Sequence, residues 1–270
     1  MNTETRTVTF SLDAERTFRR VLFFWLTLEI LLFLADVAFT YSDLVDLRPI
    51  NRLFNMTRED GLGSLLAITQ ILFVSLTLWL IVLTRRRDLP RRLRFGWYFL
   101  AIFFTYLFLD DGAAIHERLG TAYEILAEDD SSADIPGQAL LELFPSYPWQ
   151  ILFMPVFSVI GLYMLWFLHH AFDDRRNFRL VFDGLLLYAT AVMLDFIEGL
   201  ESGHVLNVLD WLKHTFDLRS YTVSHFNKTV EETIEMAGTT LIWVAFLRHF
   251  MQQTPVLELH FPSRNARPSS

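Results

Sequence analysis

Residues 21–40 read VLFFWLTLEILLFLADVAFT. A helix of this length is about 30 Å long, which matches the hydrocarbon thickness of a bilayer. Only two of the twenty side chains, Glu29 and Asp36, carry a charge. The stretch therefore predicts a membrane-spanning helix at the start of the chain.

Five further stretches of similar length and apolarity follow along the 270 residues. Hydrophobic residues make up 52% of the chain, which is typical of a protein that lies mostly in lipid. We therefore expect an all-α fold, a polytopic membrane helix bundle of about six transmembrane helices formed by residues 21–250, with residues 1–20 as an N-terminal arm and 251–270 as a C-terminal tail. The predicted spans are 21–40, 62–84, 95–115, 149–171, 178–199 and 229–250.

The distribution of basic residues predicts the orientation of the bundle. Sixteen of the 23 Lys and Arg lie in the N-terminal arm, the second and fourth connections and the tail. Segments rich in Lys and Arg stay on the cytoplasmic side. Both termini are expected to be cytoplasmic, in a multi-pass protein of the cell membrane, and of the inner membrane if the source is bacterial.

Several classes of function find no support in the composition. The chain has no cysteine, which excludes disulfides, thiolate catalysis and iron–sulfur ligation. The net charge of −8 gives no reason to expect nucleic acid as a partner. A G-x-S-x-G element is absent, and Ser64 and Ser75 have no histidine near them in the sequence.

Acidic residues inside the predicted spans are informative, because a carboxylate in lipid is costly and must face the bundle interior or a wet cavity. Glu29 lies near the middle of the first span. Asp36 follows seven residues later, almost two helical turns, so both lie on one helix face. This pair is a candidate transport pathway.

A larger set of acids gathers at the predicted outer ends of the spans. The third span ends in Asp110 and Asp111, followed by His116 and Glu117, and residues 112–114 are small enough to allow close helix approach. The fifth span ends in Asp195 and Glu198, the sixth begins with Glu231, Glu232 and Glu235, and Glu59 and Asp60 precede the second.

Carboxylates at this density repel one another, and a bound cation would resolve the conflict. We expect a divalent metal ion, held by oxygen ligands and one imidazole. The alternative is that these acids are hydrated helix ends, above all Glu201 and Glu231. Histidines of the third outer connection, His204, His214 and His225, could complete a metal shell, although surface or packed histidines are commoner. The predicted metal ligands are Asp110, Asp111, His116, Asp195, Glu198, Glu232 and Glu235.

Two outer connections are longer than a helical hairpin needs. Residues 116–148 hold seven acids and one Arg118, and predict an acidic mouth over the bundle. Residues 204–216 mix apolar and polar positions. They predict either a helix lying in the membrane interface or a loop packed on the bundle.

Three segments carry a resemblance to a known family. Residues 54–60, 109–117 and 231–236 resemble recurring motifs of uncharacterised bacterial multi-pass membrane proteins. The second motif usually reads Asp-Glu where this chain has Asp110-Asp111. This resemblance implies the fold and no activity. A looser similarity links the chain to alkaline ceramidases and adiponectin-receptor-like metal hydrolases, whose histidine signature it lacks.

Three functions fit these observations. The first is a membrane-embedded metal-dependent enzyme, such as a hydrolase, that acts on a membrane lipid or lipid-like substrate. In it His116 or Glu117 would move protons as the catalytic residue. The second is a cation- or proton-coupled transporter that uses Glu29 and Asp36. The third is a non-catalytic subunit or scaffold.

Overall fold

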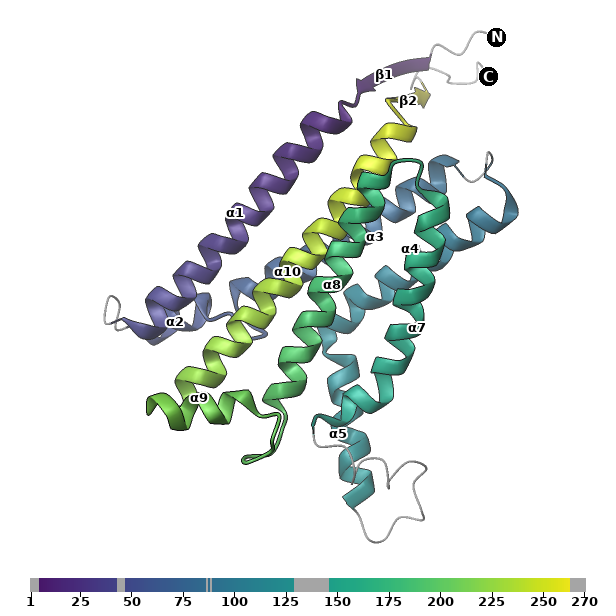
Figure 1. The fold of residues 1–270 in the computed structure, drawn as a ribbon. Helices are drawn as coiled ribbons and strands as arrows, with labels where there is room; N and C mark the ends of the chain where they lie inside the picture. The colour runs from purple at the N-terminus through teal and green to yellow at the C-terminus, as the bar shows by residue number, and fades with distance from the viewer. Residues whose placement is uncertain (1–4, 43–46, 86, 88, 129–145, 263–270) are drawn as a thin grey trace, which may run out of the picture.

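The computed structural model describes residues 5–42, 47–85, 87, 89–128 and 146–262. Two strands, β1 (Thr5–Ser11) and β2 (Val256–Pro262), flank a set of helices. The helices are α1 (Ala14–Tyr41), α2 (Arg48–Phe54), α3 (Leu62–Arg85), α4 (Arg91–Ala113), α5 (Ile115–Glu128), α7 (Pro148–Ala171), α8 (Arg175–Glu198), α9 (Val208–Phe216) and α10 (Ser220–Gln253). The predicted helix bundle is confirmed (Figure 1).

Five helices in the described part of the chain, α1, α3, α4, α7 and α8, are long and apolar enough to cross a membrane. The sixth predicted span falls inside α10, which is 34 residues long and packs against α1, α3 and α8. It is not among the helices apolar enough to cross a membrane, so a sixth crossing stays a prediction. The evidence that the chain spans a membrane therefore comes from these five helices.

The two ends of the bundle differ in what covers them. At one end β1 pairs with β2 in antiparallel register, and we call this the proximal end (Figure 1). The short helices α2 and α9, together with α5, lie at the opposite, distal end. The sequence predicted an arm and a tail but not their pairing.

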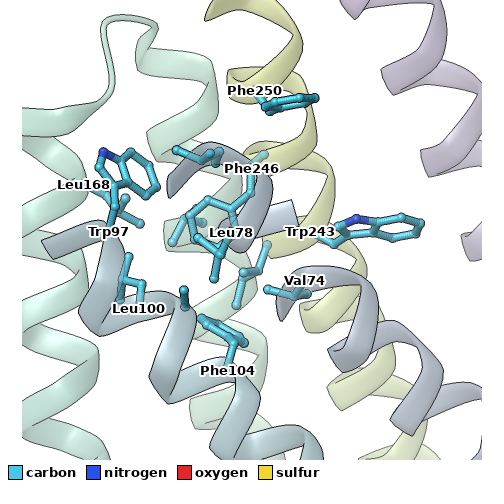
Figure 2. Packing of buried hydrophobic residues seen from close by; sticks show 14 of the residues in the cluster. Val74, Leu78, Trp97, Leu100, Phe104, Leu168, Trp243, Phe246 and Phe250 are labelled. Atoms are coloured by element: carbon cyan, nitrogen blue, oxygen red, sulfur yellow. The ribbon is translucent and has the colours of Figure 1, made fainter. Parts of the chain in front are cut away.

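Aromatic and branched apolar side chains fill the centre of the bundle (Figure 2). Val74, Leu78, Leu100 and Phe246, from α3, α4 and α10, are fully buried. Trp25 of α1 meets Trp243 of α10 edge to face, with ring centroids 5.5 Å apart. This core fixes the helices whose distal ends carry the acids.

The small residues that permit close helix approach are not those expected. A Cβ on Gly184 would lie 2.8 Å from the carbonyl oxygen of Gly238, and one on Gly238 would lie 2.9 Å from that of Gly184. Gly112, in contrast, has nothing within 4 Å. The prediction for residues 112–114 was wrong at Gly112, because α4 ends there and the chain turns away into α5.

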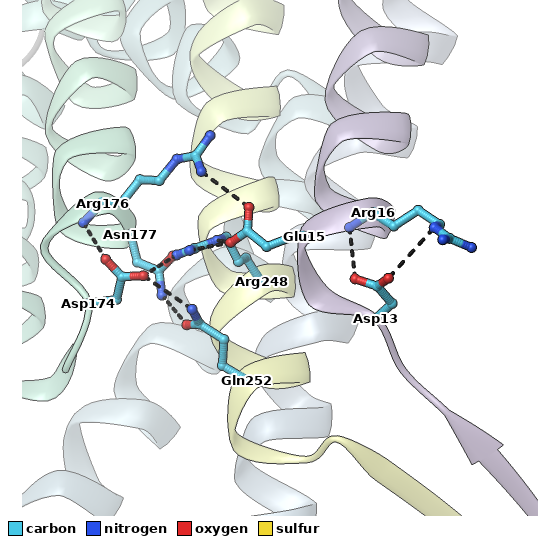
Figure 3. Close-up of polar contacts among 8 residues, drawn as sticks. All are labelled: Asp13, Glu15, Arg16, Asp174, Arg176, Asn177, Arg248 and Gln252. Atoms are coloured by element: carbon cyan, nitrogen blue, oxygen red, sulfur yellow. Dashed lines mark hydrogen bonds and ion pairs between the residues drawn. The ribbon is translucent and has the colours of Figure 1, made fainter.

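A buried arginine joins three elements at the proximal end (Figure 3). The Arg248 guanidinium of α10 bonds Glu15 of α1, Asp174 at the N-cap of α8 (2.6 Å) and Asn177 of α8 (2.7 Å). The backbone N–H of Arg176, with Arg248 and Gln252, lowers the pKa of Asp174 to about 2. This network ties α1, α8 and α10 together.

The distal connections are partly helical. Residues 208–216 form α9, so of the two alternatives for 204–216 the helix is observed, and its place in the membrane interface stays a prediction. Apolar side chains such as Trp211 and Phe216 are exposed on it. Residues 115–128 of the predicted acidic mouth form α5. Four of its acids, Asp129, Asp130, Asp134 and Glu142, lie outside the described residues.

Candidate functional site

A polar cleft of about 510 Å³ opens at the distal end, between α3, α4, α5, α7, α8 and α10. Acids predicted from separate spans meet there, as the end-of-span pattern implied. The predicted residues that line the cleft are Asp111, His116, Glu117, Asp195, Glu198 and Glu232. Convergence of the outer acids is the part of the site that the sequence predicted.

Asp110 and His116 form a close pair at one wall of the cleft. Ala114 takes a left-handed conformation (φ 49°), which ends α4 and turns the chain into α5. The turn brings His116 back to Asp110, whose Oδ1 accepts the His116 backbone N–H at 3.0 Å. The imidazole Nδ1 lies 2.7 Å from Asp110 Oδ2, and the Tyr106 hydroxyl donates to Oδ1 at 3.3 Å.

The surroundings of His116 fix its ring and its charge. Trp149 of α7 packs edge to face against it, with ring centroids 5.0 Å apart. Burial lowers the pKa of His116, but the hydrogen bond and charge of Asp110, with Glu117 and Asp111, outweigh this effect and raise the pKa above 6.5. Because Nδ1 is engaged by Asp110, Nε2 is the nitrogen left to exchange a proton with a bound molecule.

A lysine lies among the acids that line the cleft. Lys228 of α10 bonds Glu231 Oε1 at 2.7 Å and lies 3.8 Å from both Asp195 Oδ1 and Glu232 Oε1. Glu231 is buried, so the hypothesis that it is a hydrated helix-end acid was wrong. Lys228 supplies positive charge of the kind that the sequence analysis assigned to a metal ion.

Neutral side chains hold the remaining carboxylates. Gln150 of α7 donates to Asp195 Oδ2 at 2.9 Å, and Asn227 of α10 donates to Glu198 Oε2 at 3.0 Å. These bonds link α7 and α10 to the end of α8. The acids thus have partners drawn from neighbouring helices.

The predicted metal ligands do not form a metal-binding group in the part of the chain that the structure describes, where no three His, Asp or Glu side chains are placed to hold an ion. Asp110 lies behind His116, and Glu235, one turn further along α10, does not line the cleft. A divalent ion stays a prediction.

Asp36 does not line the cleft but lies in a buried cluster behind the lining residue Met56. Its carboxylate accepts the Met56 N–H at 3.1 Å and the Thr229 hydroxyl at 2.9 Å, and it lies 3.5 Å from His225 Nε2. His225 Nδ1 is 2.9 Å from the hydroxyl of Tyr41, which is partly exposed. One of the three histidines proposed for a metal shell therefore packs against Asp36.

Glu29 lies deeper, between α1, α3 and α10, and is 1% exposed. Its Oε1 accepts bonds from Gln70 Nε2 and Thr240 Oγ1, both at 2.6 Å. The prediction that intramembrane acids face the bundle interior and have partners holds for Glu29 and Asp36. Among the described residues, no hydrogen bond links the partners of Glu29 to those of Asp36.

Sequence reasoning missed Lys228 and Ser64, which line the cleft, and Gln150, which bonds the cleft residue Asp195. Lys228 had a signal, since it stands three and four residues before Glu231 and Glu232 on one helix face. Gln150 and Ser64 had none, because their neighbours come from distant segments.

A family model described as a domain of unknown function (DUF8692) matches residues 21–250. The expected likeness to an uncharacterised family is thus confirmed. No curated protein and no solved structure matches the chain.

Proposed function

Since the chain belongs to the DUF8692 family, whose function is unknown, we propose a function from the geometry of its distal cleft: a membrane hydrolase in which Asp110 and His116 form the proton-transfer dyad. The single observation that carries this proposal is the 2.7 Å contact between His116 Nδ1 and Asp110 Oδ2 at the wall of a polar cleft.

The dyad has the features that general base catalysis needs. A buried carboxylate on one imidazole nitrogen fixes the tautomer and the ring orientation, and stabilises the imidazolium that forms during the reaction. Asp110 is 3% exposed and His116 borders the cleft. The raised pKa makes the neutral imidazole of His116 a stronger base.

In this mechanism His116 Nε2 accepts a proton from water as the water oxygen attacks a carbonyl carbon or phosphorus atom of the substrate. The same proton then passes to the leaving group. Arg58 and Lys228 line the cleft, each already paired with carboxylates, and a substrate that displaces one of these contacts would place its developing negative charge beside a cation. The position of the cleft, at the end of apolar helices, favours a lipid-like substrate that enters from the bilayer.

Hydrolysis of para-nitrophenyl octanoate and of bis-para-nitrophenyl phosphate by purified protein tests the proposal. We expect turnover of at least one probe, and a loss of about 100-fold or more in His116→Ala. His170→Ala, an exposed histidine at the proximal end, is the matched control and should keep full activity. Equal rates in wild type and His116→Ala, or no turnover of either probe, would falsify the dyad.

The predicted divalent ion needs its own test. Elemental analysis of protein purified without chelator measures whether an ion is present. The same measurement on Glu198→Gln and Glu235→Gln shows whether these acids hold it. A metal-free wild-type protein would overturn the metal hypothesis and leave the dyad standing.

A second candidate, proton-coupled transport, is favoured by the Asp36 cluster. His225 lies between the buried Asp36 and the partly exposed Tyr41, which gives a proton a route of three ionisable groups. Proton uptake by proteoliposomes should then fall in Asp36→Asn and in Glu29→Gln, while His116→Ala keeps it. Unchanged uptake in both acid variants would remove this candidate.

A further inference from the structure

An apolar groove of about 420 Å³ lies on another part of the distal end, between α8, α9 and α10. Ile197, Leu212 and Phe226, one from each helix, are among its walls. Its volume is within the range of roughly 300–1,000 Å³ that is usual for small-molecule sites. Apart from Thr222 and Asn227, all its lining residues are apolar, so its chemistry suits a hydrocarbon chain.

A second cavity of about 600 Å³ adjoins the groove, because Leu209 and Leu218 line both. This cavity is polar. Two of its charges neutralise each other: Asp210 lies 3.8 Å from Lys213 and also accepts bonds from Ser202 and Gly203. An apolar groove that continues into a polar cavity has the form of a site for an amphiphile.

The remaining charges of the polar cavity are acidic. Glu198 accepts a hydrogen bond from the amide of Asn227, which is neutral and so does not compensate the negative charge of the carboxylate. Asp217, the second acid, lies at the C-terminal end of α9 and is exposed. Because the charges of Asp210 and Lys213 compensate each other, the remaining ionisable groups of the cavity are these two carboxylates and one histidine, His214. The cavity therefore favours a head group with an ammonium over one with only phosphate.

The location of the groove indicates that its occupant is a lipid. Side chains beside it on α9 and α10, including Val208, Trp211 and Phe226, are about half exposed. They lie at the end of a bundle whose helices are long and apolar enough to span a bilayer. Exposed apolar side chains on a short amphipathic helix at that level contact the membrane interface.

We propose that α8, α9 and α10 bind one amine-bearing membrane lipid, with an acyl chain in the apolar groove and the ammonium in the adjoining polar cavity beside Glu198 and Asp217. Glu198 also lines the polar cleft, but the lipid site does not use the Asp110–His116 dyad. It would hold a lipid whether or not the cleft is catalytic.

Native mass spectrometry of the purified protein tests this site with two probes, palmitoyl lysophosphatidylethanolamine and palmitoyl lysophosphatidylglycerol, offered in equal amounts. We expect wild type to retain the ethanolamine lipid about two- to fivefold more than the glycerol lipid, as one exposed ion pair allows. Asp217→Asn should reduce this preference and keep chain binding. Equal retention of the two probes by wild type would overturn the head-group assignment.

Groove-filling variants locate the acyl chain. Leu212→Trp and Val230→Trp should each abolish retention of both probes, whereas Leu186→Trp, at an exposed position of α8 outside the groove, should retain them. Thermal unfolding of each variant shows whether it is folded. If both folded filling variants bind the probes as wild type does, the groove is not the chain site.

Discussion

Nδ1 of His116 lies 2.7 Å from Oδ2 of Asp110, although the two residues belong to different helices. The left-handed turn at Ala114 makes this contact possible, since it ends α4 and starts α5 at a new angle. Each side chain alone would be a polar group at the end of a helix. Together they give the cleft an imidazole with a fixed orientation.

Asp110→Asn should lower the pKa of His116, because the imidazolium loses the charge and the hydrogen bond that now outweigh burial. The measurement is a ¹³C NMR titration of labelled histidine. His116 gains its proton more readily in the folded state than in the unfolded state. The pair therefore stabilises the fold fully below the unfolded pKa, and this stability is lost as pH rises through the folded pKa.

Asp110→Asn should also change how thermal stability depends on pH. In wild type the contribution of His116 is lost as pH rises above ~6.5, the ordinary pKa of histidine, and in the variant this loss should be absent. The exposed His170 provides the reference signal. A His116 pKa that stays the same or rises in Asp110→Asn would contradict the assigned contact.

Lys228→Gln should destabilise the distal end, because it leaves Glu231 buried without its cation. Breaking a buried ion pair costs about 3–5 kcal/mol, and we expect the lower part of this range because Lys228 is 30% exposed. Thermal unfolding in detergent measures the loss. The double variant Lys228→Gln, Glu231→Gln should recover part of it, and strictly additive losses would argue against the pair.

Arg248→Met should destabilise the proximal end by about 1.5–3 kcal/mol, because Glu15 and Asp174 lose a shared hydrogen-bonding partner but are exposed enough to be hydrated. Arg248→Lys should recover only part of this, since an ammonium cannot reproduce the forked contacts of the guanidinium. Arg176→Ala is the matched control. Arg176 contacts the same Glu15 from an exposed position, so its loss should cost at most about 1 kcal/mol.

Gly184→Ala should destabilise the pairing of α8 with α10 by about 1–3 kcal/mol, because the new methyl group would meet the backbone of Gly238. Gly161→Ala is the matched control in α7, where nothing lies within 4 Å of a new Cβ. That variant should gain about 0.5–1 kcal/mol from helix propensity. Chemical or thermal unfolding distinguishes the two, and equal effects would mean that α8 and α10 do not approach this closely.

The sequence could predict the helices and the gathering of acids, because both depend on local patterns. Long apolar stretches fix where a helix can cross lipid, and carboxylates at the ends of several such stretches must meet at one end of the bundle. It could not predict which acids pair. Lys228 contacts three acids on two helices, and Asp195 depends on Gln150 of a third.

The antiparallel pairing of β1 with β2 shows the same limit. Seven residues at each terminus alternate in a way that suits a strand, but their partners lie about 250 positions apart in the chain. Such a contact depends on the ends of α1 and α10 being brought together. Residues 5–11 and 256–262 therefore gave no reason to expect a sheet.

By itself the sequence determined that this chain forms a helical membrane bundle with its acids collected at one end, because hydropathy and helix length act on each segment separately. Only the tertiary structure decided what those acids do. The turn at Ala114 joins Asp110 to His116, and the packing of α10 places Lys228 among carboxylates that the sequence analysis assigned to a metal ion. Charge compensation depends on distances between helices, and these are set by packing alone.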